Sequence, residues 1–361
     1  MTGPGRHRAA VAGVGMTALS CESGRSVLEL ALEAARAALA DAQLPAADVD
    51  AVLTYHLGDS VPVTYLARAL GVERLGWHNE LFGGGSQCAS ILGDAAMLID
   101  AGIASTVLVY RALNGRSGTR LGQAPLRVGD GAEGQFTLPY GMLGPVHLFA
   151  LAAQRYLAGT GTDLAPFVLR SRACAEANPR ALRRQPMTLD EYEASPLVAS
   201  PLRRADCCQE TDGACALVIT AADRAPGSPL IRAAVRGGGP GCSTMDKAPD
   251  VSRVFSRHVA PALYAAAGIA PADVDVALLY DAYSFLVPAQ LADFCLAADV
   301  PVNPHGGLLS EGYVHGLNNV AEAVRQLSGD AGPTQVPGAS VALCTGFGGS
   351  YGSAAVLVSD R

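Results

Sequence analysis

Residues 271–280 read Pro271-Ala272-Asp273-Val274-Asp275-Val276-Ala277-Leu278-Leu279-Tyr280, and residues 46–55 read Ala46-Ala47-Asp48-Val49-Asp50-Ala51-Val52-Leu53-Thr54-Tyr55. Each stretch follows a helix-like segment, turns at Ala-Asp-Val-Asp, continues as an apolar strand and ends at a tyrosine, at a constant offset of 225 residues. Self-similarity at a fixed offset indicates a repeated structural unit. We therefore predict an internal duplication that gives two similar halves, each with its own sheet, packed as pseudo-symmetric layers.

Helix-like and strand-like segments alternate along the first half of the chain. Apolar residues recur at helical spacing from Ser26 to Leu44, whereas short apolar runs such as Ser105–Leu113 are typical of buried strands. This alternation predicts a layered α/β fold with a largely parallel sheet. Because the pattern restarts near Pro229, we divide the chain into an N-terminal half, residues 1–225, and a C-terminal half, residues 226–361.

The middle of the chain, from about residue 114 to 204, is less regular than its flanks. Leu143–Leu157 and Asp163–Ala177 have helical patterns, while Arg180–Arg204 is basic, contains proline and is typical of a loop. We interpret this region as an insertion of helices and loops that covers the sheet, where substrate-binding loops are often found.

Composition excludes several classes of protein. The chain has 361 residues, of which 50% are hydrophobic and 16% charged, so it can bury a large core. A net charge of −7 argues against nucleic acid as the main partner. No apolar run is long enough to span a membrane, and the apolar run after the basic residues Met1–Arg8 is too short and glycine-rich for a signal peptide. We expect a cytoplasmic protein.

The nine cysteines show no spacing typical of metal ligands. There is no Cys-x-x-Cys motif, and Cys207 and Cys208 are adjacent. In a cytoplasmic protein such residues are mostly free, buried thiols, and we predict no metal site.

Two glycine-rich segments in the C-terminal half are candidates for a functional site. The first, Asn303–Asn318, carries two histidines, a tyrosine, a glutamate and four glycines and leads into a helical pattern at Val320–Leu327. The second is the turn Cys344–Gly352. Glycine permits positive φ and a close approach of the backbone to a ligand, which favours a binding or catalytic role for these loops.

Five segments together resemble the thiolase superfamily. Gly83–Gly102 is similar to the nucleophile loop and helix of thiolases, and Thr211–Ala214 is similar to their Asp-Gly-Ala strand entry. Tyr280–Ser284 corresponds to the His-Asp-Cys-Phe-Ser of sterol-carrier-protein thiolases, Gly306–Gly316 to the Gly-Gly…Gly-His-Pro…Gly segment, and Cys344–Gly346 to the Cys-x-Gly turn. The resemblance implies duplicated βαβαβαββ halves in an α-β-α-β-α architecture.

Within that superfamily the chain most resembles the lipid-transfer-protein-type thiolase homologues. The similarity lies in Tyr110–Asn114, in Pro201–Arg203 with Asp206–Cys208, and in the stretch from Pro301 to Leu327. This group includes retro-aldolases of steroid side-chain degradation, which cleave a β-hydroxyacyl-CoA and work with an OB-fold partner protein. The resemblance also implies a homodimer, because thiolases pair their N-terminal halves, and coenzyme A as part of the substrate, with no tightly bound cofactor.

Two catalytic groups of the thiolases are replaced in this chain. The position of the nucleophilic cysteine is Gly85, while Cys88 follows three residues later within the first helical turn, so a relocated nucleophile and a packed helix residue both remain open. The position of the Gly-His-Pro histidine is Tyr313. Tyrosine, with a pKa near 10, is a poor base for a thiol but suits proton transfer to or from an alcohol or enolate.

These correspondences give a set of candidate catalytic residues. We expect Tyr313 and Tyr351 to be the acid and base tyrosines, with Cys344 beside them at the position that moves the α-proton in thiolases. Asp281 is expected to orient a water molecule or the loop, and His315 to assist Tyr313.

Three functions remain open from the sequence. The first is aldol or retro-aldol chemistry on an acyl thioester, carried by CoA or a carrier protein, without a covalent intermediate. The second is a thiolase-like acyltransferase that uses Cys88 or Cys344. The third is a non-catalytic thiolase-like subunit of a complex.

Overall fold

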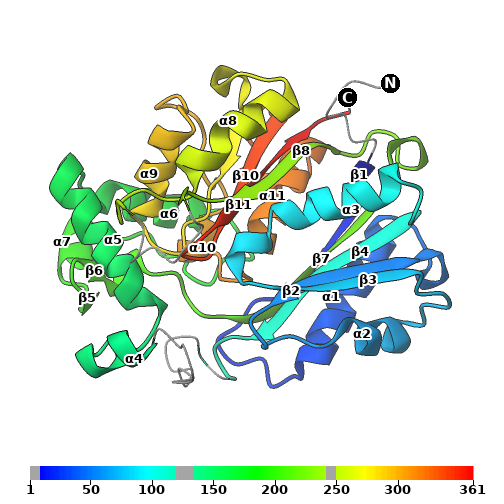
Figure 1. Cartoon of the computed structure of the whole chain (residues 1–361), viewed down its shortest axis with the longest axis horizontal. Helices are drawn as coiled ribbons and strands as arrows, with labels where there is room; N and C mark the ends of the chain where they lie inside the picture. Colours follow the sequence, from blue (N-terminus) through cyan, green and yellow to red (C-terminus); the bar gives the residue numbers. More distant parts are fainter. Residues whose placement is uncertain (1–8, 119, 121–133, 241–248, 361) are drawn as a thin grey trace.

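The computed structural model describes residues 9–118, 120, 134–240 and 249–360. Its centre is a nine-stranded sheet with the order β3-β2-β4-β7-β1-β8-β11-β10-β9 (Figure 1). The first half contributes β1 (Ala9–Met16), β2 (Ala51–His56), β3 (Trp77–Phe82), β4 (Thr106–Asn114) and β7 (Asp212–Ala221). The second half contributes β8 (Leu230–Gly237), β9 (Val276–Leu278), β10 (Val341–Phe347) and β11 (Gly352–Val358).

The two halves repeat one strand order. From the outer edge inward the first half runs β3-β2-β4-β7-β1, and the second runs β9-β10-β11-β8. The position that β3 occupies in the first half is taken in the second by a single parallel bridge between Ala277 and Val302. The predicted duplication therefore corresponds to a repeat of strand order in three dimensions.

Two expectations about the sheet were wrong. The halves do not have separate sheets, because β1 and β8 pair at Ala10 and Leu230 and the Val11 N–H donates to the Pro229 carbonyl at 2.9 Å. The sheet is also mixed rather than largely parallel. In each half one strand, β7 or β11, runs antiparallel to both of its neighbours. Periodicity indicates strands but not their directions.

The duplicated turn has the same structural role in both halves. The Asp50 carboxylate accepts hydrogen bonds from the Ser105 and Thr106 N–H groups at the start of β4. The Asp275 carboxylate likewise accepts from the Ser340 and Val341 N–H groups at the start of β10. The second aspartate of Ala-Asp-Val-Asp thus joins the turn to the neighbouring strand in each half.

Helices cover both faces of the sheet and fill the space between the halves. Helix α1 (Val27–Asp41) packs on β1, β4 and β7, and α8 (Ser256–Ala267) packs on β8 and β11. Helices α3 (Ser90–Asp100) and α11 (Leu317–Ser328) contact strands of both halves. The helices thus give the α-β-α-β-α layers that the family resemblance implied, with the two β layers joined into one sheet where β1 pairs with β8.

The insertion lies at one end of the molecule (Figure 1). Its predicted helices are confirmed as α5 (Pro145–Thr160) and α6 (Ala165–Glu176), and α4 (Gly134–Thr137) precedes them. The expected loop from Arg180 to Arg204 is more ordered than predicted, with α7 (Leu189–Glu193), β5 (Leu197–Ala199) and β6 (Leu202–Arg203). A capping box between Thr188 and Glu191 starts α7, a local signal that the basic composition obscured. Residues 119 and 121–133 of the insertion lie outside the described residues.

Within the described residues, no helix combines the length and the apolar character needed to cross a bilayer. The same residues contain no cluster of three or more His, Cys, Asp or Glu side chains suited to a metal ion. Met1–Arg8 lie outside the described residues. The division of the chain at residue 225 remains a prediction.

Candidate active site

Three consecutive glycines between β3 and α3 form the centre of the candidate site. A Cβ atom at Gly83 would lie 3.0 Å from the Tyr351 hydroxyl, and one at Gly84 would lie 3.5 Å from Cε1 of His315. A Cβ atom at Gly85 would overlap the hydroxyl and ring of Tyr280. The absence of side chains here allows three polar side chains from distant parts of the chain to approach one loop.

Two tyrosine hydroxyls form a short hydrogen bond at this loop. The Tyr280 and Tyr313 hydroxyl oxygens are 2.6 Å apart, and both side chains are buried. The Tyr280 N–H donates to Thr345 Oγ1 at 2.8 Å, and the Tyr313 N–H donates to Thr211 Oγ1 at 3.1 Å, so both backbones are fixed. Burial raises the pKa of each phenol well above its usual value. Both tyrosines are therefore neutral at working pH, and one hydroxyl donates to the other.

His315 lies edge-on to Tyr313, with ring centroids 4.9 Å apart. Its Nδ1 accepts hydrogen bonds from Arg111 Nε at 3.1 Å and Nη2 at 2.7 Å. Burial, followed by the charge of Arg111, lowers the pKa of His315 to about 3. Since a guanidinium only donates, Nδ1 must carry the lone pair, and the proton of the neutral ring is on Nε2.

Arg111 is completely buried and connects His315 to Asp59 through hydrogen bonds. Its Nη2 donates to Asp59 Oδ2 at 2.6 Å, and its Nη1 donates to the Ala112 carbonyl at 2.7 Å. Burial would raise the pKa of Asp59, but the Arg111 charge opposes it, and the pKa of this carboxyl is lowered overall. The result is a chain from Asp59 through Arg111 to His315.

Asp281 accepts hydrogen bonds from the backbone of the glycine-rich loop, whereas the hydroxyls of Tyr280 and Tyr313 bond each other. Its carboxylate accepts hydrogen bonds from the Leu308 N–H at 2.8 Å and the Leu309 N–H at 3.4 Å, at the start of α10 (Gly307–Ser310). A side chain at Gly307 would overlap this carboxylate. Burial raises the pKa of Asp281 to about 6. Of the two roles expected for Asp281, the geometry favours orientation of the loop.

The two candidate cysteines are packed thiols in this structure. Cys88 is completely buried, its Sγ is 3.5 Å from the Thr345 carbonyl, and Cβ atoms at Gly316 and Gly346 would lie 2.7 and 2.5 Å from that Sγ. Burial raises the pKa of Cys88 to about 12 and that of Cys344 well above its usual value. This environment opposes the thiolate that a nucleophile requires.

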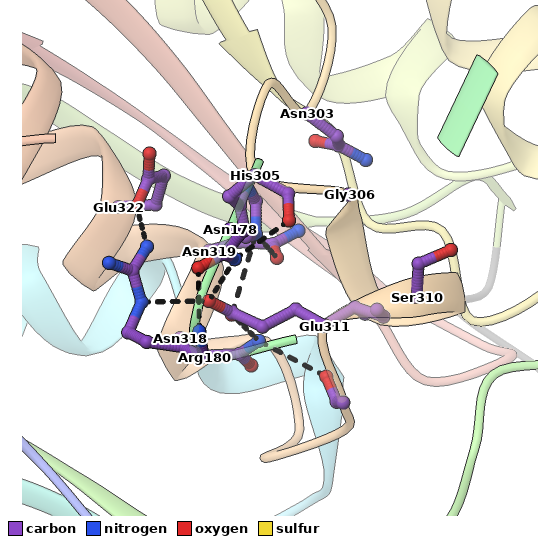
Figure 2. Close-up of polar contacts among 12 residues, drawn as sticks. Asn178, Arg180, Asn303, His305, Gly306, Ser310, Glu311, Asn318, Asn319 and Glu322 are labelled. Atoms are coloured by element: carbon purple, nitrogen blue, oxygen red, sulfur yellow. Dashed lines mark hydrogen bonds and ion pairs between the residues drawn. The ribbon is translucent and has the colours of Figure 1, made fainter. Parts of the chain in front are cut away.

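A buried polar network joins the glycine-rich loop Asn303–Asn318 to the insertion and to α11 (Figure 2). Glu311 accepts from Arg180 Nε at 3.1 Å, Asn178 Nδ2 at 3.0 Å and Asn318 Nδ2 at 2.9 Å. Arg180 Nη2 also donates to Glu322 at 2.6 Å. Burial would raise the pKa of Glu311, but nearby His305 and Arg180 and the two amides lower it. The loop that carries Tyr313 and His315 is thus held from two sides.

Comparisons with known proteins identify thiolase-like relatives of this chain. Residues 241–361 match the family described as thiolase C-terminal domain-like. The 17-hydroxy-3-oxo-4-pregnene-20-carboxyl-CoA lyase of Mycobacterium tuberculosis is 37% identical over 361 residues, covering 89% of this chain and 92% of the lyase. A steroid side-chain-cleaving aldolase from Thermomonospora curvata is 36% identical over 393 residues and covers 98% of both chains. The solved structure of an Ltp2-ChsH2(DUF35) aldolase superposes with a TM-score of 0.92 at 34% identity, over 99% of this chain and 100% of that chain.

The chain belongs to the lipid-transfer-protein-type homologues of the thiolase superfamily.

The replaced nucleophile of this thiolase homologue has a structural explanation. Gly85 stands at the predicted nucleophile position, and the space where a cysteine side chain would begin is filled by Tyr280. In this structure, Tyr280 therefore requires a glycine at position 85.

The structure gives Tyr351 and Tyr313 different hydrogen-bond partners, and the acid and base roles expected for these two tyrosines remain a prediction. The Tyr351 hydroxyl accepts from Gln87 Nε2 at 2.8 Å and is 3.4 Å from the Phe82 carbonyl, at the far end of the glycine loop. The hydroxyl partner of Tyr313 is Tyr280. The sequence contained a signal for this, because Tyr280 stands at the position of the histidine in the His-Asp-Cys-Phe-Ser of sterol-carrier-protein thiolases.

Arg111 and Asp59 were also missed as parts of the site. Arg111 lies in the stretch Tyr110–Asn114 that resembles the lipid-transfer group, which is a weak signal. Nothing in the sequence indicates that Asp59 is in contact with it, because the partner depends on how the segment after β2 folds back over β4.

Proposed function

We propose that this thiolase homologue cleaves a β-hydroxyacyl-CoA by a retro-aldol reaction in which the Tyr280–Tyr313 pair transfers the proton. The observation that carries the proposal is the 2.6 Å contact between the two hydroxyls at the place where a thiolase has its nucleophile. The chain is a thiolase-like enzyme of the C–C-cleaving type, and its relatives bear the names of CoA-ester lyases and aldolases.

The proton and electron balance suits two neutral phenols. Cleavage of the Cα–Cβ bond leaves its electron pair on Cα as an enolate, while the β-hydroxyl loses its proton and becomes a carbonyl. In the proposed relay, one tyrosine oxygen accepts that proton and passes its own to the other, and the second tyrosine protonates Cα. No tyrosinate is required at any stage, which fits the raised pKa values of both phenols. Positioned proton transfer of this kind typically contributes about 10²- to 10⁴-fold in rate.

The acyltransferase alternative has less support. It requires a reactive thiolate, and both Cys88 and Cys344 are buried with raised pKa values. We propose that Cys88 fills space between Gly316 and Gly346 and that Cys344 packs within β10.

The test is a panel of β-hydroxyacyl-CoA esters given to the wild type and to Tyr280→Phe, Tyr313→Phe and Cys88→Ala, with products followed by liquid chromatography and mass spectrometry. We expect a carbonyl compound and a shorter acyl-CoA from the wild type and Cys88→Ala, and losses of about 10²- to 10⁴-fold from both tyrosine variants. Intact-mass measurement of the protein should show no acyl adduct. An adduct that disappears in Cys88→Ala would contradict the proposal.

We further propose a homodimer formed along β3. This strand is the outer edge of the nine-stranded sheet and is largely exposed, with Trp77 44% and Phe82 74% accessible. An exposed edge of this kind is a template for pairing with a second strand. Light scattering after size exclusion should show a dimer that Trp77→Lys weakens and Tyr65→Lys, on the neighbouring helix α2 (Val63–Leu70), leaves intact.

An OB-fold partner and a cytoplasmic location are also proposed. The partner is suggested by the solved Ltp2-ChsH2(DUF35) aldolase, whose name includes a second protein. Co-expression with the DUF35 protein encoded nearest to this chain's gene should give a complex that co-purifies at constant ratio. Lyase activity that appears only in that complex would make the partner part of the enzyme, and activity of the isolated chain would remove that requirement.

A further inference from the structure

The His315 side chain has one buried polar atom with no hydrogen-bond partner. Within the described residues only five buried side-chain nitrogen or oxygen atoms lack a partner: Ser20 Oγ, Ser60 Oγ, Asn303 Oδ1, His305 Nδ1 and His315 Nε2. Of these, His315 Nε2 is the one whose ring contacts the tyrosine pair, because His315 lies edge-on to Tyr313. A buried donor without a partner costs about 1–3 kcal/mol, so its retention calls for a physical reason.

The direction and protonation of this ring are fixed from the other side. Two N–H groups of Arg111 point at Nδ1, and Asp59 holds the guanidinium. The backbone is also constrained: His315 has φ of +49°, a conformation that non-glycine residues seldom adopt, and its carbonyl accepts from the Tyr55 hydroxyl at 3.0 Å. The ring is therefore held as the Nε2–H tautomer.

Such a group is a hydrogen-bond donor that does not transfer its proton. A neutral imidazole next to a guanidinium resists a second proton, and its Nε2–H is far too weak an acid to be lost to a carbonyl. A fixed, buried donor of this kind is what stabilises negative charge that develops on an oxygen atom. In a retro-aldol reaction on a thioester, that charge develops on the thioester carbonyl oxygen as the enolate forms.

We propose that His315 Nε2–H binds the thioester carbonyl oxygen of the substrate and stabilises the enolate, with Arg111 and Asp59 as positioning residues that hold the required tautomer. The inference rests on the proposed lyase function. It assigns His315 a different role from the assistance to Tyr313 expected from the sequence: the proton stays on Nε2, and the tyrosine pair carries the proton transfer.

The protonation state can be measured without any turnover. In protein with ¹⁵N-labelled histidine, one of seven ring systems should be missing from the spectrum of His315→Gln, which assigns the His315 signals. We expect Nε2 to carry the proton and Nδ1 to remain unprotonated from pH 8 to pH 5, and the Nε2 proton signal to shift when acetyl-CoA is added. A proton on Nδ1, or an Nε2 signal that acetyl-CoA leaves unchanged, would overturn the proposal even if the enzyme proves to be a lyase.

Two variants at position 315 separate donation from bulk. In His315→Gln the amide oxygen can accept from Arg111 and the amide nitrogen can donate in place of Nε2, whereas His315→Leu keeps similar bulk and loses both functions. We expect kcat to fall about 10²- to 10³-fold in His315→Leu, the usual effect of removing one oxyanion donor, and by about tenfold or less in His315→Gln. Equal loss in both variants would overturn the proposal, because it would indicate acid–base catalysis or packing.

Asp59→Asn tests whether Asp59 and Arg111 position His315. This substitution removes less from the buried interior than a substitution of Arg111 would. We expect the variant to fold, and the His315 ring to lose its single tautomer and show a mixture of Nε2–H and Nδ1–H signals, with a fall in kcat at little change in KM. If activity is absent from the wild type both alone and with its DUF35 partner while the Nε2 proton still shifts with acetyl-CoA, the lyase function fails and the binding role stands.

Discussion

The duplicated segments contain two pairs of equivalent residues. The aspartates Asp50 and Asp275 have the same structural role, whereas the tyrosines Tyr55 and Tyr280 have different hydrogen-bond partners. Asp50 and Asp275 each join their turn to the next strand through backbone N–H groups. Five residues later the repeated tyrosines differ. Tyr55 donates to the carbonyl oxygen of His315 at 3.0 Å, whereas Tyr280 bonds the side-chain hydroxyl of Tyr313 at 2.6 Å.

Both tyrosines reach the same loop, but with different consequences. The first half supplies a tyrosine that fixes the backbone of the loop, and the second half supplies one for which we propose a part in the chemistry. The difference arises from the surroundings: Gly85 leaves room for the Tyr280 hydroxyl, and Tyr313 lies opposite it. Equivalent positions in the two halves thus have different partners because their surroundings differ.

The largest expected effect is a contrast between the two repeated tyrosines. Tyr280→Phe removes one member of the proton relay and should lower kcat about 10²- to 10⁴-fold. Tyr55→Phe removes one hydrogen bond to a backbone carbonyl, and we expect a stability loss of about 1 kcal/mol. Steady-state kinetics with thermal unfolding of both variants measures the contrast, and equal losses of kcat would remove the distinction drawn here.

The second effect concerns the network that holds the loop from the insertion. Arg180→Met removes the guanidinium shared by the buried Glu311 and Glu322 and leaves Glu322, among the described residues, only the longer ion pair with Arg325 at 3.9 Å. Removal of one partner from a buried ion pair typically costs about 3–5 kcal/mol. Arg184→Met is the matched control, because Arg184 is exposed and, within the described part of the chain, its side chain donates only to the Glu176 carbonyl. Denaturant unfolding should separate the two variants clearly; a loss below about 1 kcal/mol for Arg180→Met would show that the network is not what stabilises the loop.

The third effect concerns the two equivalent aspartates, Asp50 and Asp275, which have the same role in the two halves. Asp50→Ala and Asp275→Ala each remove an acceptor for two backbone N–H groups, and we expect similar stability losses of about 1–3 kcal/mol. Denaturant unfolding of both variants under one set of conditions measures this. A difference larger than about 2 kcal/mol would mean that the repeated aspartates do not have equivalent roles.

The smallest effect is a pH dependence of stability that comes from His315 in the second half and from its contact with Arg111 of the first half. The folded pKa of His315 is lowered from 6.5 to about 3, so between these values the unfolded chain binds more protons than the folded chain. The contribution is complete above about pH 6.5 and is lost as pH falls, by about 1 kcal/mol at pH 5.5. His315→Gln should flatten this part of the stability profile. An unchanged acid limb in the variant would mean that His315 does not titrate as described.

The sequence predicted most elements of the fold but not their pairing. Helical periodicity located α1, α5 and α6, and the repeated turn located β2 and β9, because these signals are local. The antiparallel direction of β7 and β11 depends on where distant strands lie, which no local pattern contains.

The site was predicted in part for the same reason. Gly85 and Tyr313 were identified because each departs from a family motif at a fixed place. The partnership of Tyr280 with Tyr313 and that of Arg111 with His315 join residues 33 and 204 positions apart, so they required the structure.

The most direct test of the central claim is the rate of β-hydroxyacyl-CoA cleavage by Gly85→Ala, compared with Gly159→Ala in α5. An added methyl group at Gly85 overlaps the Tyr280 hydroxyl, whereas one at Gly159 meets no atom within 4 Å. The account predicts that Gly85→Ala loses most of its lyase activity while Gly159→Ala remains fully active. A Gly85→Ala protein that is folded and as active as the wild type would contradict the claim that Tyr280, in the space of the lost nucleophile, carries out the chemistry.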